Sequence, residues 1–403
     1  MGSVQSSVSQ ALPPKKSFLY DPKVRGIFYQ TLLVCVVGYL FYIAATNAVD
    51  NLRRAKIASG FGFLENTAGF DISQTLISFS AAGSTYGDAF IVGLLNTLIV
   101  SAIGIVFATF LGFAVGIARL SSNWMVAKVA MVYVETLRNI PLLLQLLFWY
   151  IAVLGPLPQP RDSFSLGAGF FLNARGLFMP RPLYAADAWA IGVAFAIGVV
   201  VTILFRRWAK KQQAATGRQY PVGWATLGLV LGLPVATWIV LALMNANPVS
   251  FDMPVKGTFN LRGGMQILPE FVALLVGLTT YTAAFIAEVV RAGILAVSKG
   301  QTEAAGSLGL KSGQTLRLVV IPQAMRVIIP PLTSQYLNLT KNSSLAVAIG
   351  YPDLVQVFMG TVLNQTGQAV EVVMITMGVY LTISLVTSFV MNIYNRRVAI
   401  VER

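Results

Sequence analysis

Residues 291–325 read RAGILAVSKGQTEAAGSLGLKSGQTLRLVVIPQAM and form the longest charged and polar stretch between the hydrophobic runs of the chain. Ala, Leu and Glu favour a helix over the first half, and Gly309 can end it. One face of a second helix is marked by four apolar residues: Leu316, Val319, Val320 and Ile321. We expect that helix to end at Pro322, since proline removes a helical hydrogen bond. The stretch therefore predicts a helix–break–helix element, which either fits a groove on another protein or connects two spans at the membrane surface.

Long apolar runs lie on both sides of this element and through most of the chain. Of the 403 residues, 56% are hydrophobic and 11% are charged, whereas a soluble domain has about 25% charged residues. Runs of about 20 apolar residues match the thickness of a bilayer. We expect about eight spans, at residues 27–46, 88–117, 129–154, 187–205, 222–244, 269–290, 326–349 and 370–394. The predicted fold is an all-α, polytopic membrane protein.

Two of these spans and two connections have features of their own. The second span is long enough to need a tilt or an interfacial first turn. We expect the seventh to be interrupted at Pro330-Pro331 and again at Lys341-Asn342. The connections at 155–186 and 245–268 are rich in Pro, Gly and Asn, which predicts surface loops outside the bilayer.

The formal charge of +14 would suit a nucleic-acid-binding protein if the bases were clustered for phosphate. Instead, basic pairs border the hydrophobic runs: Lys15-Lys16, Arg206-Arg207, Lys210-Lys211 and Arg396-Arg397. This is the positive-inside bias of membrane proteins, so we expect no nucleic-acid partner and both termini in the cytoplasm. A cluster of bases from Arg53 to Lys56 argues against that orientation. Asp88 and Glu371, at the outer ends of spans, are expected to be solvated helix caps.

Histidine is absent, and Cys35 is the only cysteine. This excludes disulfides within the chain, Cys/His zinc sites and His-dependent catalytic triads. Cys35 lies in an apolar run, where we expect a small, buried filler. No Gly-Lys dipeptide occurs, so a phosphate-binding P-loop is excluded as well.

The motif of the quoted stretch resembles the EAA loop of ABC importer permeases. The matching residues are Glu303-Ala304-Ala305, Gly309 four positions after the last alanine, and Ile321-Pro322. Val319 and Ile321 are conservative departures from the family pattern. The resemblance implies that residues 299–322, the coupling loop, bind an ATPase subunit. The residues expected to carry that contact are Gln301, Glu303, Ala304, Ala305, Gly309 and Pro322.

Further segments resemble the polar amino-acid family of these permeases, over residues 90–150 and 270–395, a five-span core. They are Asn96-Thr97-Leu98, Glu135 to Leu143, Ala287 to Ile294, Lys299-Gly300-Gln301 and Lys341 to Leu345. The added first span, residues 60–72 and the two spans between 187 and 244 are most similar to general L-amino-acid permease subunits of Gram-negative bacteria. The chain then divides as 1–26 cytoplasmic segment, 27–87 extra span and periplasmic loop, 88–154 core spans, 155–268 inserted spans, 269–395 core with coupling loop, and 396–403 tail.

The resemblance implies a multi-pass subunit of the bacterial inner membrane that imports polar L-amino acids. A periplasmic amino-acid-binding protein delivers the substrate, and a second permease subunit, homologous or identical, completes the path. Two ABC ATPase subunits bind ATP and Mg and drive the alternation between outward and inward openings. The chain itself is expected to hold no cofactor, no metal and no catalytic residue.

An amino acid crossing lipid needs counter-charges and backbone dipoles, so polar residues within spans are the candidates for its path. Arg138 and Asn139 precede Ile140-Pro141, where the freed backbone groups could bind a ligand. Arg138 is expected either to bind the substrate carboxylate or order this turn, or else to snorkel or pair with Glu135.

Two further positions belong to the expected path. A polar patch interrupts the seventh span, and we favour a half-helix substrate site there over a purely structural break. Its residues are Thr340, Lys341, Asn342, Ser343 and Ser344. For Glu288 we favour a local ion pair with Arg291 over contact with the substrate ammonium.

Two other classes of protein compete with the importer. A secondary transporter needs ionisable groups deep in its spans, and the acidic candidates, Glu135 and Glu288, are not clearly central. A membrane enzyme would need acid, base or metal-binding groups, and the sequence lacks His and clustered carboxylates.

Overall fold

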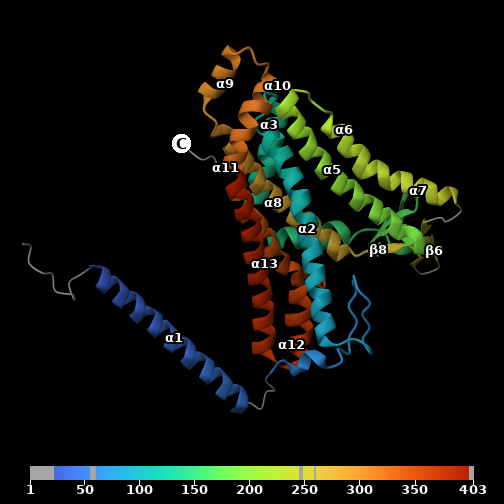
Figure 1. Ribbon diagram of the computed structural model, residues 1–403. Helices are drawn as coiled ribbons and strands as arrows, with labels where there is room; N and C mark the ends of the chain where they lie inside the picture. The colour runs from blue at the N-terminus through green and yellow to red at the C-terminus, as the bar shows by residue number, and fades with distance from the viewer. Residues whose placement is uncertain (1–21, 55–59, 245–247, 258–259, 399–403) are drawn as a thin grey trace, which may run out of the picture.

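The computed structural model describes residues 22–54, 60–244, 248–257 and 260–398. Helices dominate (Figure 1). The α-helices are α1 Pro22–Arg54, α2 Tyr86–Ala118, α3 Trp124–Asn139, α4 Leu142–Leu147, α5 Trp189–Thr216, α6 Val222–Leu227, α7 Leu233–Leu243, α8 Pro269–Leu295, α9 Lys299–Ser307, α10 Ser312–Thr315, α11 Ile321–Asn342, α12 Leu363–Thr366 and α13 Ala369–Val398. The 3-10 helices are η2 Phe61–Glu65, η4 Pro160–Asp162, η5 Ala186–Ala188 and η8 Ser343–Ile349. The π-helical turns are η3 Phe148–Leu154, η6 Gly228–Gly232, η7 Leu316–Val320 and η9 Val355–Val362.

Seven of the eight predicted spans are confirmed in position, and the third, at 129–154, is a bent pair of helices. Seven helices within the described ranges are long and apolar enough to cross a membrane, or eight if the bent pair α3 and α4–η3 is one span. Helix α2 has 33 residues, about 50 Å at 1.5 Å per residue, which is longer than the apolar layer of a bilayer and agrees with the predicted tilt or interfacial first turn. The first 21 residues, Lys56 and the last five residues, on which part of the orientation argument rests, lie outside the described residues.

Helix α8 is the centre of the bundle, with α2, α3 and α11 packed around it (Figure 1). Small residues on α2 face α8 at every fourth position, so the two backbones approach closely. A Cβ atom added at Gly112 would lie 2.5 Å from Ile286 Cγ2, and one at Gly116 would lie 2.7 Å from the carbonyl oxygen of Ala287. The α2–α8 contact therefore requires glycine at both positions.

Residues 350–354 are held against α2 by two buried polar side chains. The Asn96 amide nitrogen donates to the Pro352 carbonyl at 2.8 Å, and the Thr97 hydroxyl accepts from the Leu354 N–H at 3.0 Å. Gly93 completes the contact, since an added Cβ atom would lie 3.0 Å from Leu354 Cα. From this anchor the chain enters η9 and α12, which the sequence did not predict.

The seventh span differs from the prediction. The helical path from Ser312 to Asn342 is continuous through α10, η7 and α11, so Pro322 does not end a helix and Pro330-Pro331 do not interrupt one. Pro322 lies in the first turn of α11, directly after the π-turn η7. Proline is tolerated in a first turn, and the π-turn already changes the hydrogen-bond pattern there. The predicted break at Lys341-Asn342 is confirmed, because α11 ends there and continues as the 3-10 helix η8.

The two connections predicted as loops contain strands instead. These are β1 Phe164–Gly167, β2 Phe170–Asn173, β3 Gly176–Met179, β4 Arg181–Tyr184, β5 Val249–Asp252, β6 Val255–Lys256, β7 Leu261–Arg262 and β8 Met265–Ile267. They form a four-stranded sheet in the order β1-β2-β3-β8 and two two-stranded sheets, β4-β5 and β6-β7. Pairing of Leu177 with Ile267 and of Leu183 with Ser250 joins the two connections. These long-range pairings satisfy backbone groups that loops would leave to water.

Between the two connections, α5 packs along α6, η6 and α7 (Figure 1). Gly198 allows this contact, because an added Cβ atom would lie 2.2 Å from the Leu229 carbonyl oxygen. Helix α1 lies apart from the bundle, and Cys35 on it is exposed, so the prediction of a buried filler is wrong.

The two acidic caps also differ from each other. Asp88 caps α2 as predicted, since its carboxylate accepts from the Thr85 N–H at 2.8 Å. Glu371, in the first turn of α13, is buried rather than solvated and accepts from the Gly60 N–H at 2.7 Å. The carboxylate of Glu371 therefore ties the segment before α2 to the last helix.

Candidate functional site: the coupling loop and the polar breaks

The coupling loop, residues 299–322, is at one end of the molecule, where α9 and α10 lie beyond the ends of the long helices (Figure 1). Helix α9 ends at Ser307, and Gly309 follows with a φ of +75°. This left-handed conformation favours glycine. The Leu310 N–H returns to the Ala305 carbonyl at 3.1 Å, which closes the end of α9. The predicted end of the first helix is confirmed.

The predicted coupling residues divide into one buried anchor and an exposed surface. Ala305 is 3% exposed and faces the rest of the segment, whereas Gln301, Glu303 and Ala304 are exposed. Leu308, at the tip, is 81% exposed. Glu303 is in none of the ion pairs among the described residues. A free carboxylate beside an exposed apolar residue is suited to contact with another protein.

One hydrogen bond connects α9 to α11, and a groove separates α9 from η7. The Gln323 amide nitrogen on α11 donates to Gln301 Oε1 on α9 at 3.1 Å. Between α9 and η7 lies a groove of about 370 Å³, lined by Thr302, Gly306, Leu310, Ser312, Thr315, Leu316 and Val320. Pro322 is exposed one turn further along, at the start of α11. Helix α9 is therefore linked to α11 by a side-chain hydrogen bond as well as through the chain.

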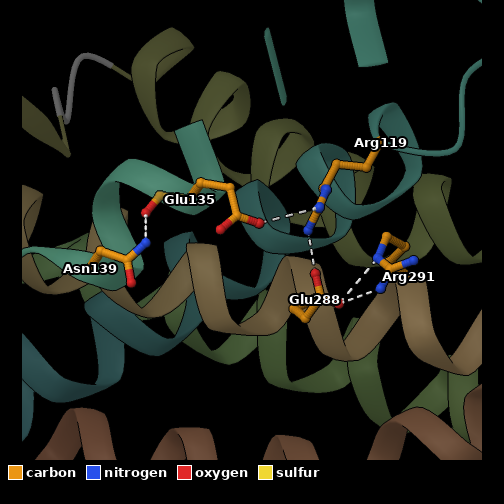
Figure 2. Close-up of polar contacts among 5 residues, drawn as sticks. All are labelled: Arg119, Glu135, Asn139, Glu288 and Arg291. Carbon is orange, nitrogen blue, oxygen red and sulfur yellow. Dashed lines mark hydrogen bonds and ion pairs between the residues drawn. The ribbon is translucent and has the colours of Figure 1, made fainter. Parts of the chain in front are cut away.

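An ion cluster around Arg119 and Glu288 joins α2, α3 and α8 (Figure 2). Glu288 accepts from Arg119 at the end of α2 and from Arg291 Nε on α8 at 3.1 Å. Arg119 also lies 3.7 Å from Glu135 on α3. The predicted pair of Glu288 with Arg291 is confirmed. The part of Arg119 was missed, because the sequence separation of 169 residues from Glu288 gives no local signal.

A Glu288→Gln variant should lose thermal stability. It removes the negative charge between two arginines, and Arg119 is only 11% exposed. Because Glu288 is 26% exposed, we expect a loss of about 1–2 kcal/mol, measured by thermal unfolding of the purified protein in detergent. Glu303→Gln, at an exposed carboxylate with no ion pair among the described residues, is the matched control and should leave the midpoint unchanged. Equal losses in both variants would contradict the role of the cluster.

Arg138 is not paired with Glu135, so that alternative is wrong. Glu135 faces Arg119, while the Arg138 guanidinium lies over the Phe285 ring at 5.1 Å from its centroid. Arg138 is exposed. The Asn139 side chain has a partner within its own helix, because its amide nitrogen donates to the Glu135 carbonyl at 2.7 Å (Figure 2).

The chain bends by 108° between α3 and α4–η3, at Ile140-Pro141. The carbonyls freed there are not open to a ligand, because Gln145 Nε2 donates to the carbonyls of Leu137 and Ile140 at 2.9 Å each. Gln145 is buried and was missed, although a lone glutamine among leucines in the third span was a possible signal. The bend is therefore built into the protein rather than held open for a substrate.

The polar patch of the seventh span is mostly satisfied within its own helix. Thr340 Oγ1 donates to the Tyr336 carbonyl at 3.0 Å, and Ser343 Oγ donates to the Thr340 carbonyl at 2.8 Å. Ser344 bonds in the same way to Lys341. Lys341 is exposed, Asn342 is half-buried, and Lys341 is in no ion pair within the described ranges. The following helix η8 packs against α4 and α8, so the patch adjoins the element that follows the bend.

Apolar spans around a central helix, with an exposed helix–break–helix element at one end, define the class: a multi-pass membrane protein. Residues 104–400 match the model of the binding-protein-dependent transport system inner membrane component family, and the chain belongs to that family. Membership implies a substrate-binding protein, an ATPase and a second permease subunit as partners.

Two relatives are similar over nearly the whole chain. The general L-amino acid transport system permease protein AapQ of Rhizobium johnstonii is 54% identical, with 96% of each chain covered. The putative amino-acid ABC transporter permease protein YhdX of Escherichia coli is 51% identical, covering 100% of this chain and 98% of its own. Among solved structures, a chain from the crystal structure of an amino acid ABC transporter with histidines covers 77% of this chain and 95% of its own, with 21% identity and a TM-score of 0.46.

Proposed function

We propose that this permease subunit carries polar L-amino acids from the periplasm to the cytoplasm, driven by ATP hydrolysis on a separate subunit docked at the coupling loop. The observation that carries the proposal is the exposed surface of α9, with its free carboxylate at Glu303 and exposed Leu308. The amino-acid transport named in AapQ and YhdX supports the substrate class. ATP and Mg bind to the partner in this scheme, and this chain holds neither.

The assembly that we propose has two permease subunits and two ABC ATPase subunits, with a periplasmic amino-acid-binding protein. The end of the molecule that bears α9 and α10 then faces the cytoplasm, as do both termini. The basic residues near this end support the orientation, since such residues are retained on the cytoplasmic side. The β layer formed by β1–β8 would face the periplasm, where the binding protein docks.

Motion of the coupling loop can reach the polar patch through one stiff element. The helical path from Ser312 to Asn342 has no break, so displacement at α10 moves the far end of α11 as well. Helix α8 is held to α2 by the close contacts at Gly112 and Gly116. We therefore propose that α11 moves relative to the α2–α8 pair, and that residues 340–344 change the side to which they are open.

Within this path we assign the substrate carboxylate to exposed cations. Lys341 is in no ion pair among the described residues, and Arg138 uses only the Phe285 ring, so both could bind an anion. Asn342 and Asn139 flank them, and Thr340, Ser343 and Ser344 shape the helix there. Glu288 is held by two arginines, so we assign it to positioning α8 beside the coupling loop rather than to the substrate ammonium.

Two measurements test the proposed function. Purification in mild detergent followed by mass spectrometry should recover a second permease chain and an ABC ATPase. Uptake of labelled glutamate into cells should require that ATPase and should be reduced by unlabelled polar amino acids. Uptake that survives deletion of the ATPase would favour a secondary transporter and overturn the proposal. Competition only by other classes of solute would overturn the substrate assignment alone.

A further inference from the structure

A basic pocket lies where α5 turns into α6. Its volume is about 470 Å³, and it is lined by Ile203, Arg206, Arg207, Ala209, Lys210, Gln213, Tyr220 and Val222. Arg206 and Lys210 are one helical turn apart, so both side chains lie on the face of α5 that borders the pocket. The pocket is distinct from the coupling loop and the polar breaks.

The positive charge of this pocket is not neutralised within its own segment. Residues 188–251 include five basic residues and no Asp or Glu. The lining bases are exposed, and none of them is in an ion pair among the described residues. Three cations around one cavity without a carboxylate among its lining residues favour an anion from outside the chain.

The lining is apolar as well as basic. Ile203 and Val222 line its apolar part, and Ala209 is 4% exposed. Tyr220 packs against Trp208 with the rings tilted and 4.9 Å between their centroids, and aromatic residues of this kind are found at the membrane–water interface. A small hydrated anion gains nothing from such apolar walls, whereas a phosphate ester attached to hydrocarbon can use both parts.

The position matches the depth of lipid headgroups. The pocket is at the end of two apolar helical segments, α5 and α6–α7, and at the same end of the molecule as α9 and α10 (Figure 1). Below it, Val200 and Leu204 on α5 are 55% and 57% exposed. An acyl chain can lie along this apolar surface while its headgroup occupies the pocket.

We propose that this pocket binds the phosphate of an anionic phospholipid, with Arg206, Arg207 and Lys210 as its ligands and the acyl chains along α5. The lipid would fix the position of the inserted α5–α7 spans at the membrane surface. The proposal is independent of the transported substrate, since it needs only a bilayer with negatively charged lipid.

The test uses the purified full-length permease in nanodiscs of phosphatidylcholine with increasing phosphatidylglycerol, with retained lipid measured by native mass spectrometry. The variant Arg206→Gln/Lys210→Gln removes two lining charges. The matched control, Lys211→Gln/Arg25→Gln, also removes two charges from exposed positions, neither of which lines the pocket. Wild type and control should retain phosphatidylglycerol in preference to phosphatidylcholine, and the lining variant should lose about tenfold or more of that preference.

Three results would overturn the proposal. Equal loss in both variants would show diffuse surface charge rather than a pocket. Displacement of the lipid by millimolar inorganic phosphate would show a site for a free anion. Unchanged lipid retention with loss of a co-purified acidic protein would show a protein-docking surface. The thermal unfolding midpoint in phosphatidylcholine alone separates a folding defect from these outcomes. The lining variant and the control variant should have the same midpoint there.

Discussion

A Gly309→Trp subunit should reach the membrane at the wild-type level but import substrate at less than about a tenth of the wild-type rate. Gly309 adopts a φ of +75° between α9 and α10, and no atom lies within 4 Å of an added Cβ. The indole therefore projects from the coupling loop without displacing the chain itself. The backbone strain of a non-glycine residue there is about 1–2 kcal/mol, too little to unfold a multi-span protein. The expected loss thus comes from obstruction of the docked ATPase.

The measurements are uptake of labelled substrate, membrane level by immunoblot and ATP hydrolysis by the reconstituted complex. Gly309→Asn is the control, since asparagine tolerates this conformation and adds little bulk. It should retain most of the uptake. Glu303→Gln tests the same surface by charge and should also reduce uptake relative to ATP hydrolysis. Normal uptake by Gly309→Trp would contradict the docking role of the coupling loop.

A Gly116→Val substitution should destabilise the fold strongly. Its Cβ atom would lie 2.7 Å from the Ala287 carbonyl oxygen and 2.8 Å from Val290 Cβ, and the carbonyl belongs to the backbone of α8 and cannot turn aside. Relief requires α2 and α8 to separate, which disrupts the packing at the centre of the bundle. We expect a loss of about 2–3 kcal/mol, at the upper end for overpacked cores, measured as a lower thermal unfolding midpoint and a smaller monodisperse fraction in detergent.

Gly378→Val on α13 is the matched control. It is the same change within another apolar helix, and no atom lies within 4 Å of its added Cβ. Both substitutions carry the same change in helix propensity, so the difference between them reports the close contact alone. If the two variants unfold at the same temperature, the close approach of α2 and α8 does not determine stability.

Local patterns were enough for most of the helical framework. The spans follow from apolar runs of bilayer length, the end of α9 follows from Gly309, and the pair of Glu288 with Arg291 follows from a spacing of three residues on one helix. Each of these depends on neighbours within a few positions. The coupling loop was predicted from the motif around Glu303, and its exposure in the fold agrees with that motif.

The errors of prediction arose where distant segments meet. Proline was expected to stop the helix at Pro322 and Pro330-Pro331, but α11 continues through the two interior prolines, as helices packed against neighbours can. Arg138 was considered as a partner of Glu135 on its own helix, but Arg119 from α2 takes that carboxylate. Gln145 binds two of the carbonyls at the bend, where freed backbone groups were considered as ligand-binding groups.

The sequence by itself determined which segments enter the membrane, where the coupling loop lies between them and which of its residues are candidates for contact with an ATPase. Hydrophobic length and turn chemistry are local properties, so they can be read along the chain. Only the tertiary structure decided the pairing of Arg119 with Glu288, the anchoring of Pro352 by Asn96 and the joining of β3 to β8. Those contacts connect residues about 90 to 260 positions apart, and such pairings are selected by the packing of whole helices and strands rather than by any pattern along the chain.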